Sequence, residues 1–309
     1  MSDYVEKSLK SGVKFEDMVP INLKTYSQLL KEMETQEKPK KIASNTSMLD
    51  SITGGFEEGR LYILSAMTKQ GKTTMAQTFL HNMAKSGTKS MIFSFEMGWQ
   101  EIATIFGEMD KSEGVKTELP VYVPVDLHRG GGTLQYHWLY EAIQKAKIEK
   151  GVSVAVIDHL HFLLPLQDFK NTSFILGGIV REIKHIAVAL NVAIILIAHT
   201  QKIQDDKVPD WTMIRDSSFI TQESDVVMMM YRVKSKEAAK KQTDESIEDI
   251  YTKKTILSVE LNRMGGKTGK VKFKHNGAKF VEWTLLDEEN HKLGIFVDDV
   301  KKAKYAPTR

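Results

Sequence analysis

The chain of 309 residues is 41% hydrophobic and 27% charged, which is typical of a globular protein with a buried core and excludes disorder throughout. It contains no cysteine, which excludes disulfides, cysteine-ligated zinc or iron–sulfur sites and thiol nucleophiles. The formal net charge of +3, from 43 basic and 40 acidic residues, is too small to indicate or to exclude a nucleic-acid partner.

The length corresponds to one large domain or two ordinary ones. No apolar run approaches the roughly 18 residues of a membrane span, and the polar N-terminus lacks the apolar segment of a signal peptide. We therefore expect a soluble protein of the cytoplasm that has no membrane partner.

Residues 1–43 are polar and rich in lysine and glutamate, and we interpret them as a short N-terminal helical extension. Apolar residues at helical spacing predict a helix over residues 23–35, with a linker over residues 34–41. These apolar residues are Leu23, Tyr26, Leu30 and Met33. Because so short a segment buries its own apolar stripe poorly, two placements stay open: packing on the chain's own core, or docking on a neighbouring subunit.

Residues 44–286 alternate short apolar runs with amphipathic stretches and are interpreted as the main domain, with residues 287–309 as a C-terminal tail. The predicted strands occupy residues 61–66, 90–95, 120–125, 152–157, 192–198, 225–231, 255–261 and 270–273. The predicted helices occupy residues 73–85, 133–150 and 174–190, and the hydrophilic residues 233–254 are interpreted as a solvated excursion. Strands without polar alternation, separated by helices, are typical of a mostly parallel central sheet with helices on both faces, so the predicted fold class is α/β.

The segment AMTKQGKT, residues 66–73, lies between a predicted strand and a predicted helix, which is the context of a Walker A phosphate loop. In such a loop, backbone N–H groups of the turn and of the helix start converge on the phosphates. Lys72 adds a positive charge at the β- and γ-phosphates, Thr73 offers a hydroxyl to Mg²⁺, and Gly71 lets the backbone approach closely. Ala66 stands where the common pattern has its first glycine, which is a mild departure.

A phosphate loop by itself indicates only that a nucleoside triphosphate is bound. The predicted ligands are therefore Mg²⁺ and ATP, or another NTP or dNTP. The predicted nucleotide-binding residues in this segment are Ala66, Gln70, Gly71, Lys72, Thr73 and Thr74.

Two carboxylates follow predicted strands. Asp158 closes the strand at residues 152–157, where it can hold the Mg²⁺ water shell together with Thr73. Glu96 follows the strand at residues 90–95 and can polarise the attacking water, provided that its strand lies near that of Asp158. The alternative for Glu96 is a surface glutamate at a strand end.

Histidines follow two of the predicted strands. His199 follows the strand at residues 192–198, where it can contact the γ-phosphate; the alternative is a strand-end histidine with an ordinary structural role. His159 and His161 form an H-x-H pattern, which we interpret as ordinary loop residues rather than a metal site.

Together these motifs resemble the RecA-like P-loop core of DnaB-like replicative helicases, from about residue 44 to about residue 276. The stretches that carry the resemblance are TSMLDSITGGFEEGRLYIL at residues 46–64, FSFEM at 93–97, VIDHL at 156–160, RDSSFITQESDVV at 215–227 and NRMG at 262–265, followed by TG at 268–269. The last stretch resembles the family's arginine-finger segment. His199 makes the chain similar to phage primase–helicases and the mitochondrial replicative helicase.

The resemblance implies an ATP-dependent hexameric ring DNA helicase that translocates 5′→3′ on single-stranded DNA during replication. ATP would lie at each subunit interface, with Arg263 reaching the neighbour's γ-phosphate and Arg232 contacting the base. Two loops, at residues 163–173 and 201–221, would face the DNA channel. The cations expected to bind DNA there are Lys170, Lys202, Lys207 and Arg215, although for each lysine a solvated surface role is an equal alternative.

Two departures from the family pattern qualify this interpretation. Leu261 stands where the family usually has a second trans-acting lysine, and Lys267 lies near enough in sequence to replace it. The short N-terminal region leaves no room for a collar or primase domain, so a separate primase or helicase loader is the expected partner. Such compactness suits a virus or a plasmid whose protein acts in the host cytoplasm.

The main alternative is another RecA-family DNA-dependent ATPase, either a recombinase-like filament or a signalling ring. A third hypothesis is a non-catalytic loader that binds ATP as a structural switch. The presence of both Glu96 and Arg263 argues against that hypothesis.

Overall fold

The computed structural model describes residues 23–35, 38–126, 133–164, 172–200, 208–214, 217–234 and 251–292. The chain forms two compact units, Met1–Lys38 and Pro39–Arg309. The smaller unit contains helix α2 (Tyr26–Thr35), which buries none of its residues. Among the described residues, no helix combines the length and the apolar character that crossing a membrane requires.

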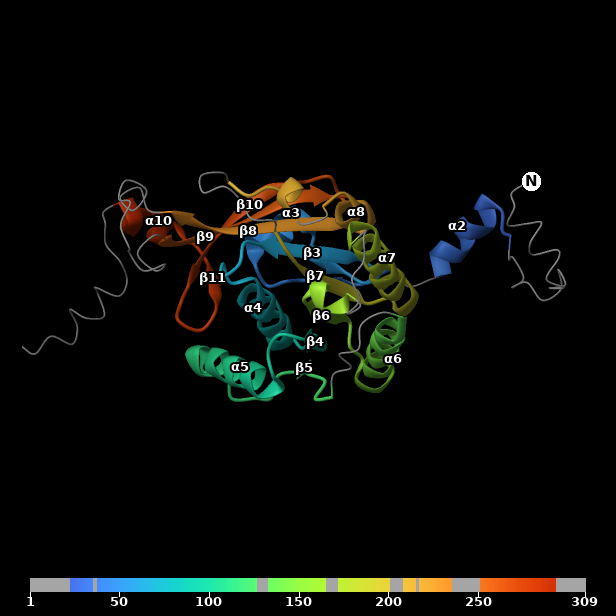
Figure 1. Cartoon of the computed structure of the whole chain (residues 1–309), viewed down its shortest axis with the longest axis horizontal. Coiled ribbons are helices and arrows are strands. Elements are labelled where there is room, and N and C mark those ends of the chain that lie inside the picture. Colours follow the sequence, from blue (N-terminus) through green and yellow to red (C-terminus); the bar gives the residue numbers. More distant parts are fainter. Residues whose placement is uncertain are drawn as a thin grey trace, which may run out of the picture. The chain divides into compact units, whose positions relative to one another are not determined.

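The larger unit is built on a nine-stranded sheet with the order β11-β10-β9-β8-β3-β7-β6-β4-β5 (Figure 1). Strands β8, β3, β7, β6, β4 and β5 run parallel, and β9, β10 and β11 continue the sheet antiparallel. The strands are β3 (Leu61–Ala66), β4 (Ser90–Ser94), β5 (Val121–Tyr122), β6 (Val154–Asp158), β7 (Ala193–His199), β8 (Val226–Lys234), β9 (Tyr251–Asn262), β10 (Gly269–His275) and β11 (Phe280–Glu282). A separate two-stranded sheet pairs β1 (Lys41–Ile42) with β2 (Phe56–Glu57). The prediction of a mostly parallel α/β sheet is confirmed.

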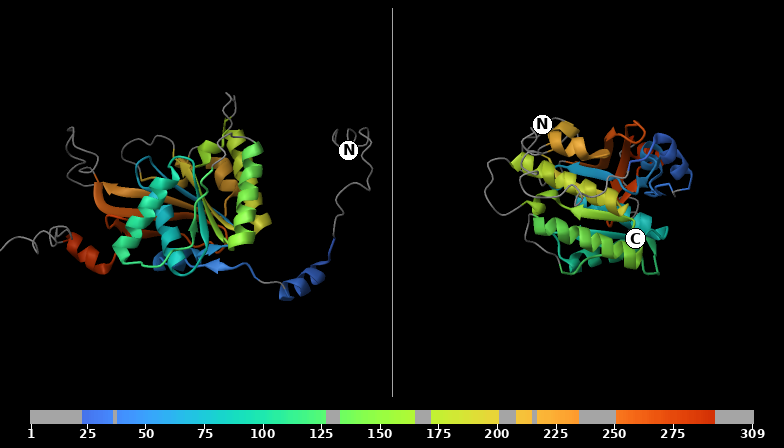
Figure 2. Two further views of the ribbon diagram at one scale, coloured as in Figure 1. Left: turned by 90° about the horizontal axis from the view of Figure 1, so that it is seen from below. Right: turned by 90° about the vertical axis from the view of Figure 1, so that its right-hand side faces the viewer.

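Helices cover both faces of the nine-stranded sheet (Figures 1 and 2). They are α3 (Ser47–Thr53), α4 (Lys72–Lys85), α5 (Trp99–Glu113), α6 (Thr133–Lys150), α7 (Thr172–Leu190) and α8 (Ser217–Glu223), and α10 (Leu285–Lys292) follows β11 without any of its described residues adding to either core. Side chains of α6, α7 and α8 form one core, and side chains of α3, α4 and α5 form the other. Strand β3 supplies both cores: Leu61 and Ile63 face the first, whereas Tyr62 and Leu64 face the second, because successive side chains of a strand point to opposite faces.

The predicted elements agree closely with the structure in the middle of the chain. Strand β3 and helix α6 have the predicted bounds, and most other predicted ends differ by one or two residues. The strand predicted at residues 120–125 shortens to Val121–Tyr122. Strands β8 and β9 also extend into the predicted excursion at residues 233–254, so that interpretation was wrong for its two ends, while residues 235–250 lie outside the described part.

Several elements were not predicted from the sequence, namely β1, β2, α3, α5, α8, β11 and α10. Helix α5 shows why, because Ile102 and Met109 are its only buried residues and they give a weak helical pattern. Helices α3 and α8 have only seven residues each, too few to establish a helical period.

Candidate nucleotide-binding site

The parallel strands bring the polar strand ends to one edge of the sheet. In the register of β3 and β7, Ala66 pairs with His199, and in that of β4 and β6, Ser94 pairs with Asp158. Glu96 lies two residues beyond Ser94, so the condition that its strand lies near that of Asp158 is met. The carboxyl ends of four adjacent strands therefore surround the start of α4.

The phosphate loop ends at Gly71, which directly precedes α4 and has a φ of +90°. A Cβ atom at this position would lie 3.0 Å from Cζ of Phe280, closer than nearly all real contacts. Glycine is therefore favoured by the left-handed backbone, and a larger residue would also press against the Phe280 ring.

Lys72, the first residue of α4, is 7% exposed, and its Nζ donates to the carbonyl oxygens of Ala66 (3.2 Å) and Met67 (3.3 Å). Burial lowers the pKa of Lys72, while the nearby carboxylates of Asp158 and Glu96 raise it. The loop thus concentrates a buried ammonium and the N–H groups of the α4 start, which is the arrangement that binds an anion such as phosphate.

Thr73 and Asp158 form the most direct contact of the site, with Thr73 Oγ1 donating to Asp158 Oδ2 at 2.7 Å. Asp158 is 1% exposed, and its pKa is raised to about 6, chiefly by burial and then by the charge of Glu96, while the Thr73 hydrogen bond and Lys72 oppose the rise. A buried carboxylate beside a hydroxyl offers the oxygen ligands that Mg²⁺ prefers. These residues therefore fit a magnesium ion by donor type and by charge.

His159, which the sequence interpretation kept outside the site, lies beside Glu96 and His199. Its Nδ1 lies 3.6 Å from Glu96 Oε2, and its ring packs edge-on against that of His199 with centroids 4.1 Å apart. Ligand atoms of Glu96, Asp158 and His159 lie within 4.8 Å of one another, close enough to share a cation. Burial, followed by the charges of His199, His161 and Lys72, lowers the pKa of His159 to about 3, so its imidazole is neutral at neutral pH.

The structure places both histidines of the H-x-H pattern beside the candidate site, a position that the sequence interpretation did not assign to them. His159 belongs to the site, and the ring centroid of His161 is 5.6 Å from that of His199. The signal in the sequence was the position of His159, directly after the strand that ends in Asp158.

The remaining predicted nucleotide contacts lie at the same edge. Gln70 is buried, and its Oε1 accepts a hydrogen bond of 2.7 Å from the backbone N–H of Arg232, which ties the loop to β8. Thr74 lies in the first turn of α4, where its carbonyl accepts a hydrogen bond from Thr78 Oγ1.

Arg263 lies at the opposite ends of the strands from the phosphate loop. It follows β9, whose residue Asn262 pairs with Val226 at the start of β8, whereas Ala66 pairs with Met230 further along that strand. Four residue steps along β8, from Val226 to Met230, separate these two levels, about 13 Å of backbone. Arg263 is exposed, and its Nη2 donates to the carbonyl of Thr221 at 3.0 Å. One chain thus does not bring Arg263 to its own phosphate loop.

The sequence model of the DnaB-like helicase C-terminal domain matches residues 41–113 and 126–282, well over half of the chain. The chain belongs to this family. The resemblance inferred from the motifs is thereby confirmed.

Two curated relatives show how far the sequence has diverged within the family. A probable replicative DNA helicase of Trieres chinensis is 24% identical over 312 residues, covering 91% of this chain and 66% of that protein. The replicative DNA helicase DnaB of Mycoplasma pneumoniae is 26% identical over 270 residues, covering 76% of this chain and 54% of that protein. The chain thus spans between about half and two thirds of the length of these relatives.

Two solved structures share the fold of this family member. A separately solved ATPase domain superposes with a TM-score of 0.63 at 17% identity, covering 84% of this chain and 97% of that domain. A DnaB-like replicative helicase described with its interactions with primase gives a TM-score of 0.63 at 16% identity, covering 90% of this chain and 71% of that one. At these identities the likeness shows a RecA-like ATPase fold alone.

Asp225 has a role in this family member that sequence reasoning did not identify. Its carboxylate accepts hydrogen bonds from Leu61 N–H (2.8 Å) and Lys184 Nζ (2.6 Å), and it forms an ion pair with Arg60. Its carbonyl accepts from the N–H of Arg263 at 2.9 Å. Asp225 thus anchors the segment that contains Arg263 to the ends of the sheet where β3 and β8 begin.

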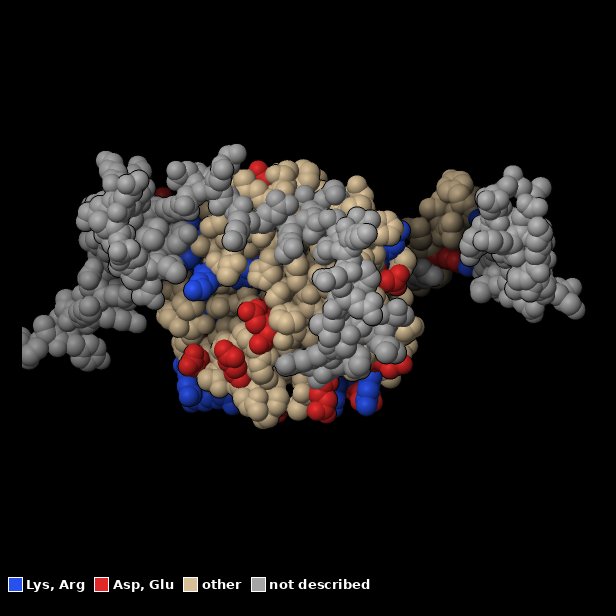
Figure 3. Space-filling view, viewed as in Figure 1, with Lys and Arg blue, Asp and Glu red and all other residues tan. Residues whose placement is uncertain are grey.

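The residues expected to bind DNA lie outside the described part of the chain, namely Lys170, Lys202, Lys207 and Arg215. On the described part of the face seen in Figure 3, basic and acidic side chains are interspersed rather than gathered into one basic surface. The DNA contacts therefore stay a prediction.

Proposed function

We propose that this chain forms a hexameric ring that hydrolyses ATP and translocates 5′→3′ on single-stranded DNA, unwinding duplex DNA during replication. Its family membership supports the helicase class. The observation that carries the ring is the position of Arg263, exposed at the edge opposite Lys72. A finger that cannot reach its own nucleotide is suited to the nucleotide of a second copy.

The proposed roles follow from the geometry at the loop. Lys72 and the N–H groups of the α4 start hold the phosphates, and Thr73 with Asp158 holds the metal. Magnesium bound there supplies positive charge to the phosphate oxygens. Glu96 is 58% exposed at its side chain, so it is accessible to water and can take the proton of the attacking molecule.

His199 and Arg232 complete the proposed nucleotide site. His199 pairs with Ala66 across the sheet and packs against His159, a position suited to contacting the γ-phosphate. Arg232 lies on β8 beside the loop, held by the contact with Gln70, and is suited to the base. Arg263 of a second copy adds a cation at the γ-phosphate, an effect worth roughly 10³–10⁵ in rate in other NTPases.

Helix α2 is proposed to strengthen the ring. Tyr26 is 74% exposed and Met33 is 64% exposed, and the helix buries none of its residues. We propose the second placement named above, docking on a neighbouring subunit, because an apolar helix face is stabilised by burial against a partner.

The proposed partners are single-stranded DNA and a separate primase or helicase loader, and the proposed location is the cytoplasm. DNA contacts from the two loops at residues 163–173 and 201–221 would be to the backbone, so binding should weaken with salt and be nearly independent of sequence. A primase partner is supported by the related DnaB-like helicase, whose structure is described with its interactions with primase.

The ATPase rate with and without single-stranded DNA, measured beside the mass of the assembly, tests this function. We expect DNA-stimulated hydrolysis by hexamers, lost in Arg263→Ala with nucleotide binding retained. Lys270→Ala is the matched control, because it removes an exposed cation from the neighbouring strand β10.

Three results would contradict the proposal. Activity in monomers that survives Arg263→Ala would indicate another P-loop ATPase. Open helical filaments on DNA would favour a recombinase. Nucleotide binding without hydrolysis would favour a loader.

A further inference from the structure

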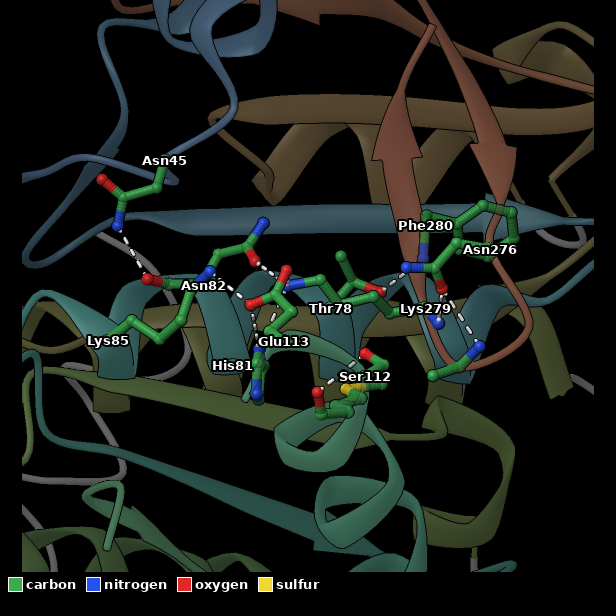
Figure 4. Close-up of polar contacts among 12 residues, drawn as sticks. Asn45, Thr78, His81, Asn82, Lys85, Ser112, Glu113, Asn276, Lys279 and Phe280 are labelled. Carbon is green, nitrogen blue, oxygen red and sulfur yellow. Dashed lines mark hydrogen bonds and ion pairs between the residues drawn. The ribbon is translucent and has the colours of Figure 1, made fainter. Parts of the chain in front are cut away.

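The turn between β10 and β11 lies over helix α4 (Figure 4). The turn is tight, because Asn276 Oδ1 accepts hydrogen bonds from the N–H groups of Ala278 (3.0 Å) and Lys279 (2.8 Å), and Gly277 has a φ of +103°. Lys279 and Phe280 follow as neighbours. Lys279 contacts α4 and α5, and Phe280 contacts the phosphate loop.

Lys279 is a buried lysine, 1% exposed, whose ammonium has an acceptor for each of its three N–H groups. Its Nζ lies 2.6 Å from Glu113 Oε1, 2.6 Å from Asn82 Oδ1 and 3.1 Å from His81 Nδ1. A buried charge is tolerated only when it is paired in this way. The ammonium therefore fastens the turn to α4 and to the end of α5.

The groups around Lys279 form a balanced set. His81 Nε2 lies 3.0 Å from Asp110 Oδ1, so the neutral tautomer donates to Asp110 and accepts from Lys279. Glu113 also accepts from Lys85 of α4, through its other oxygen, at 2.5 Å. The cluster holds two cations and two carboxylates around a neutral imidazole, which suits a permanent anchor.

Phe280, the residue after Lys279, connects the turn to the phosphate loop. Its N–H donates to Thr78 Oγ1 of α4 at 3.1 Å, and its side chain is buried. The ring lies against Gly71, since a Cβ there would meet Phe280 Cζ at 3.0 Å. Gly71 immediately precedes Lys72, so the ring restrains the residue on which the geometry of the phosphate cradle depends.

We propose that Lys279 is a positioning residue for nucleotide binding: its buried anchor holds Phe280 against Gly71 and so maintains the binding shape of the phosphate loop. The inference rests on the proposed nucleotide site. It adds a part of the chain, the turn after β10, to which the sequence motifs assign no role in that site.

Binding of mant-ADP with Mg²⁺ to Lys279→Met tests the proposal, because methionine keeps the length of the side chain and removes its charge. We expect the Kd to rise about tenfold. The KM for ATP should rise in parallel, whereas kcat should change less than about twofold, since chemistry in the filled site is unaffected. Lys85→Met is the matched control, because it removes a cation from Glu113 without releasing the turn, and it should leave the Kd within about twofold.

A double-mutant cycle with Phe280→Leu identifies the route of the effect. If Lys279 acts through Phe280, the double variant should bind mant-ADP about as weakly as Phe280→Leu alone. Additive losses would overturn the proposal. So would a Lys279→Met variant that melts at a lower temperature but binds with the wild-type Kd, because the lysine would then serve the fold alone.

Two further measurements test the proposal if Lys279→Met does not fold or if the wild type does not bind the nucleotide. If Lys279→Met fails to fold, Glu113→Gln weakens the same anchor with little change of shape and should raise the Kd in the same direction, and an unchanged Kd in that variant would overturn the proposal. If the wild type itself binds no mant-ADP, the proposed nucleotide function fails and this inference with it. A wild type that binds, with unaffected variants, refutes the inference alone.

Discussion

Lys72 and Arg263 lie at opposite ends of the central strands of the sheet, although both belong to the predicted nucleotide site. Lys72 is buried at the start of α4, whereas Arg263 is exposed after β9 and donates to the carbonyls of Thr221 and Asp225. The separation makes assembly a condition of catalysis in the proposed function.

Removing the loop cation should abolish the proposed activity without unfolding the chain. In Lys72→Ala we expect ATP hydrolysis and unwinding of a forked duplex to fall at least about 100-fold, because the buried ammonium is the main positive charge in the loop. Lys69→Asn is the control, since Lys69 is exposed in the same loop at a φ of +63°, which asparagine tolerates. Unwinding that persists in Lys72→Ala would argue against this loop as the site.

A comparison of alanine substitutions at Gly71 and Gly87 separates the effect of the contact with Phe280 from the effect of backbone strain. Both have positive φ, +90° and +80°, so alanine at either should cost about 1–3 kcal/mol in unfolding free energy. A Cβ at Gly71 meets Phe280 at 3.0 Å, whereas one at Gly87 meets nothing within 4 Å. Gly71→Ala should therefore destabilise more in urea denaturation and alone weaken nucleotide binding. Equal losses would mean that the Phe280 ring moves aside freely.

His81 should make stability depend on pH. Burial, and then the facing ammonium of Lys279, lower the pKa of His81 below its usual value, while Asp110 and Glu113 oppose the shift. The unfolded state thus binds more protons below about pH 6.5, so stability is complete above that pH and falls as the pH decreases. His81→Asn should melt with a smaller change between about pH 7.5 and about pH 5 than the wild type. Parallel melting curves would show that His81 does not titrate in this range.

Two ion pairs of helix α7 should differ in their contribution to stability. Lys184 Nζ lies 2.6 Å from Asp225 Oδ2 at a largely buried position, and its loss should destabilise by about 2 kcal/mol because Asp225 stays buried. Arg181 pairs with Glu223 at 2.8 Å but is 62% exposed, so Arg181→Ala should change stability by less than about 0.5 kcal/mol. Urea denaturation of Lys184→Met beside Arg181→Ala measures the difference. Similar small losses would show that Asp225 is held by Arg60 and Leu61 alone.

The phosphate loop could be predicted from the sequence because its function is local. Residues 66–73 are contiguous, and a strand end, a turn with Gly71 and a helix start need no distant partner to form an anion site. The apolar strands and helix α6 were predictable for the same reason, since their periodicity is carried by neighbouring residues.

Other features depend on which segments lie side by side, and no local pattern records this. The pairing of β4 with β6 places Glu96 near Asp158, and the antiparallel return of β9 carries Arg263 to the far edge. The contacts of Lys279 with Glu113 and His81 join residues more than a hundred positions apart. The sequence by itself determined the chemistry of the loop and the class of fold, whereas the order and direction of the strands decided which side chains meet, because long-range packing selects one arrangement among many with the same local periodicity.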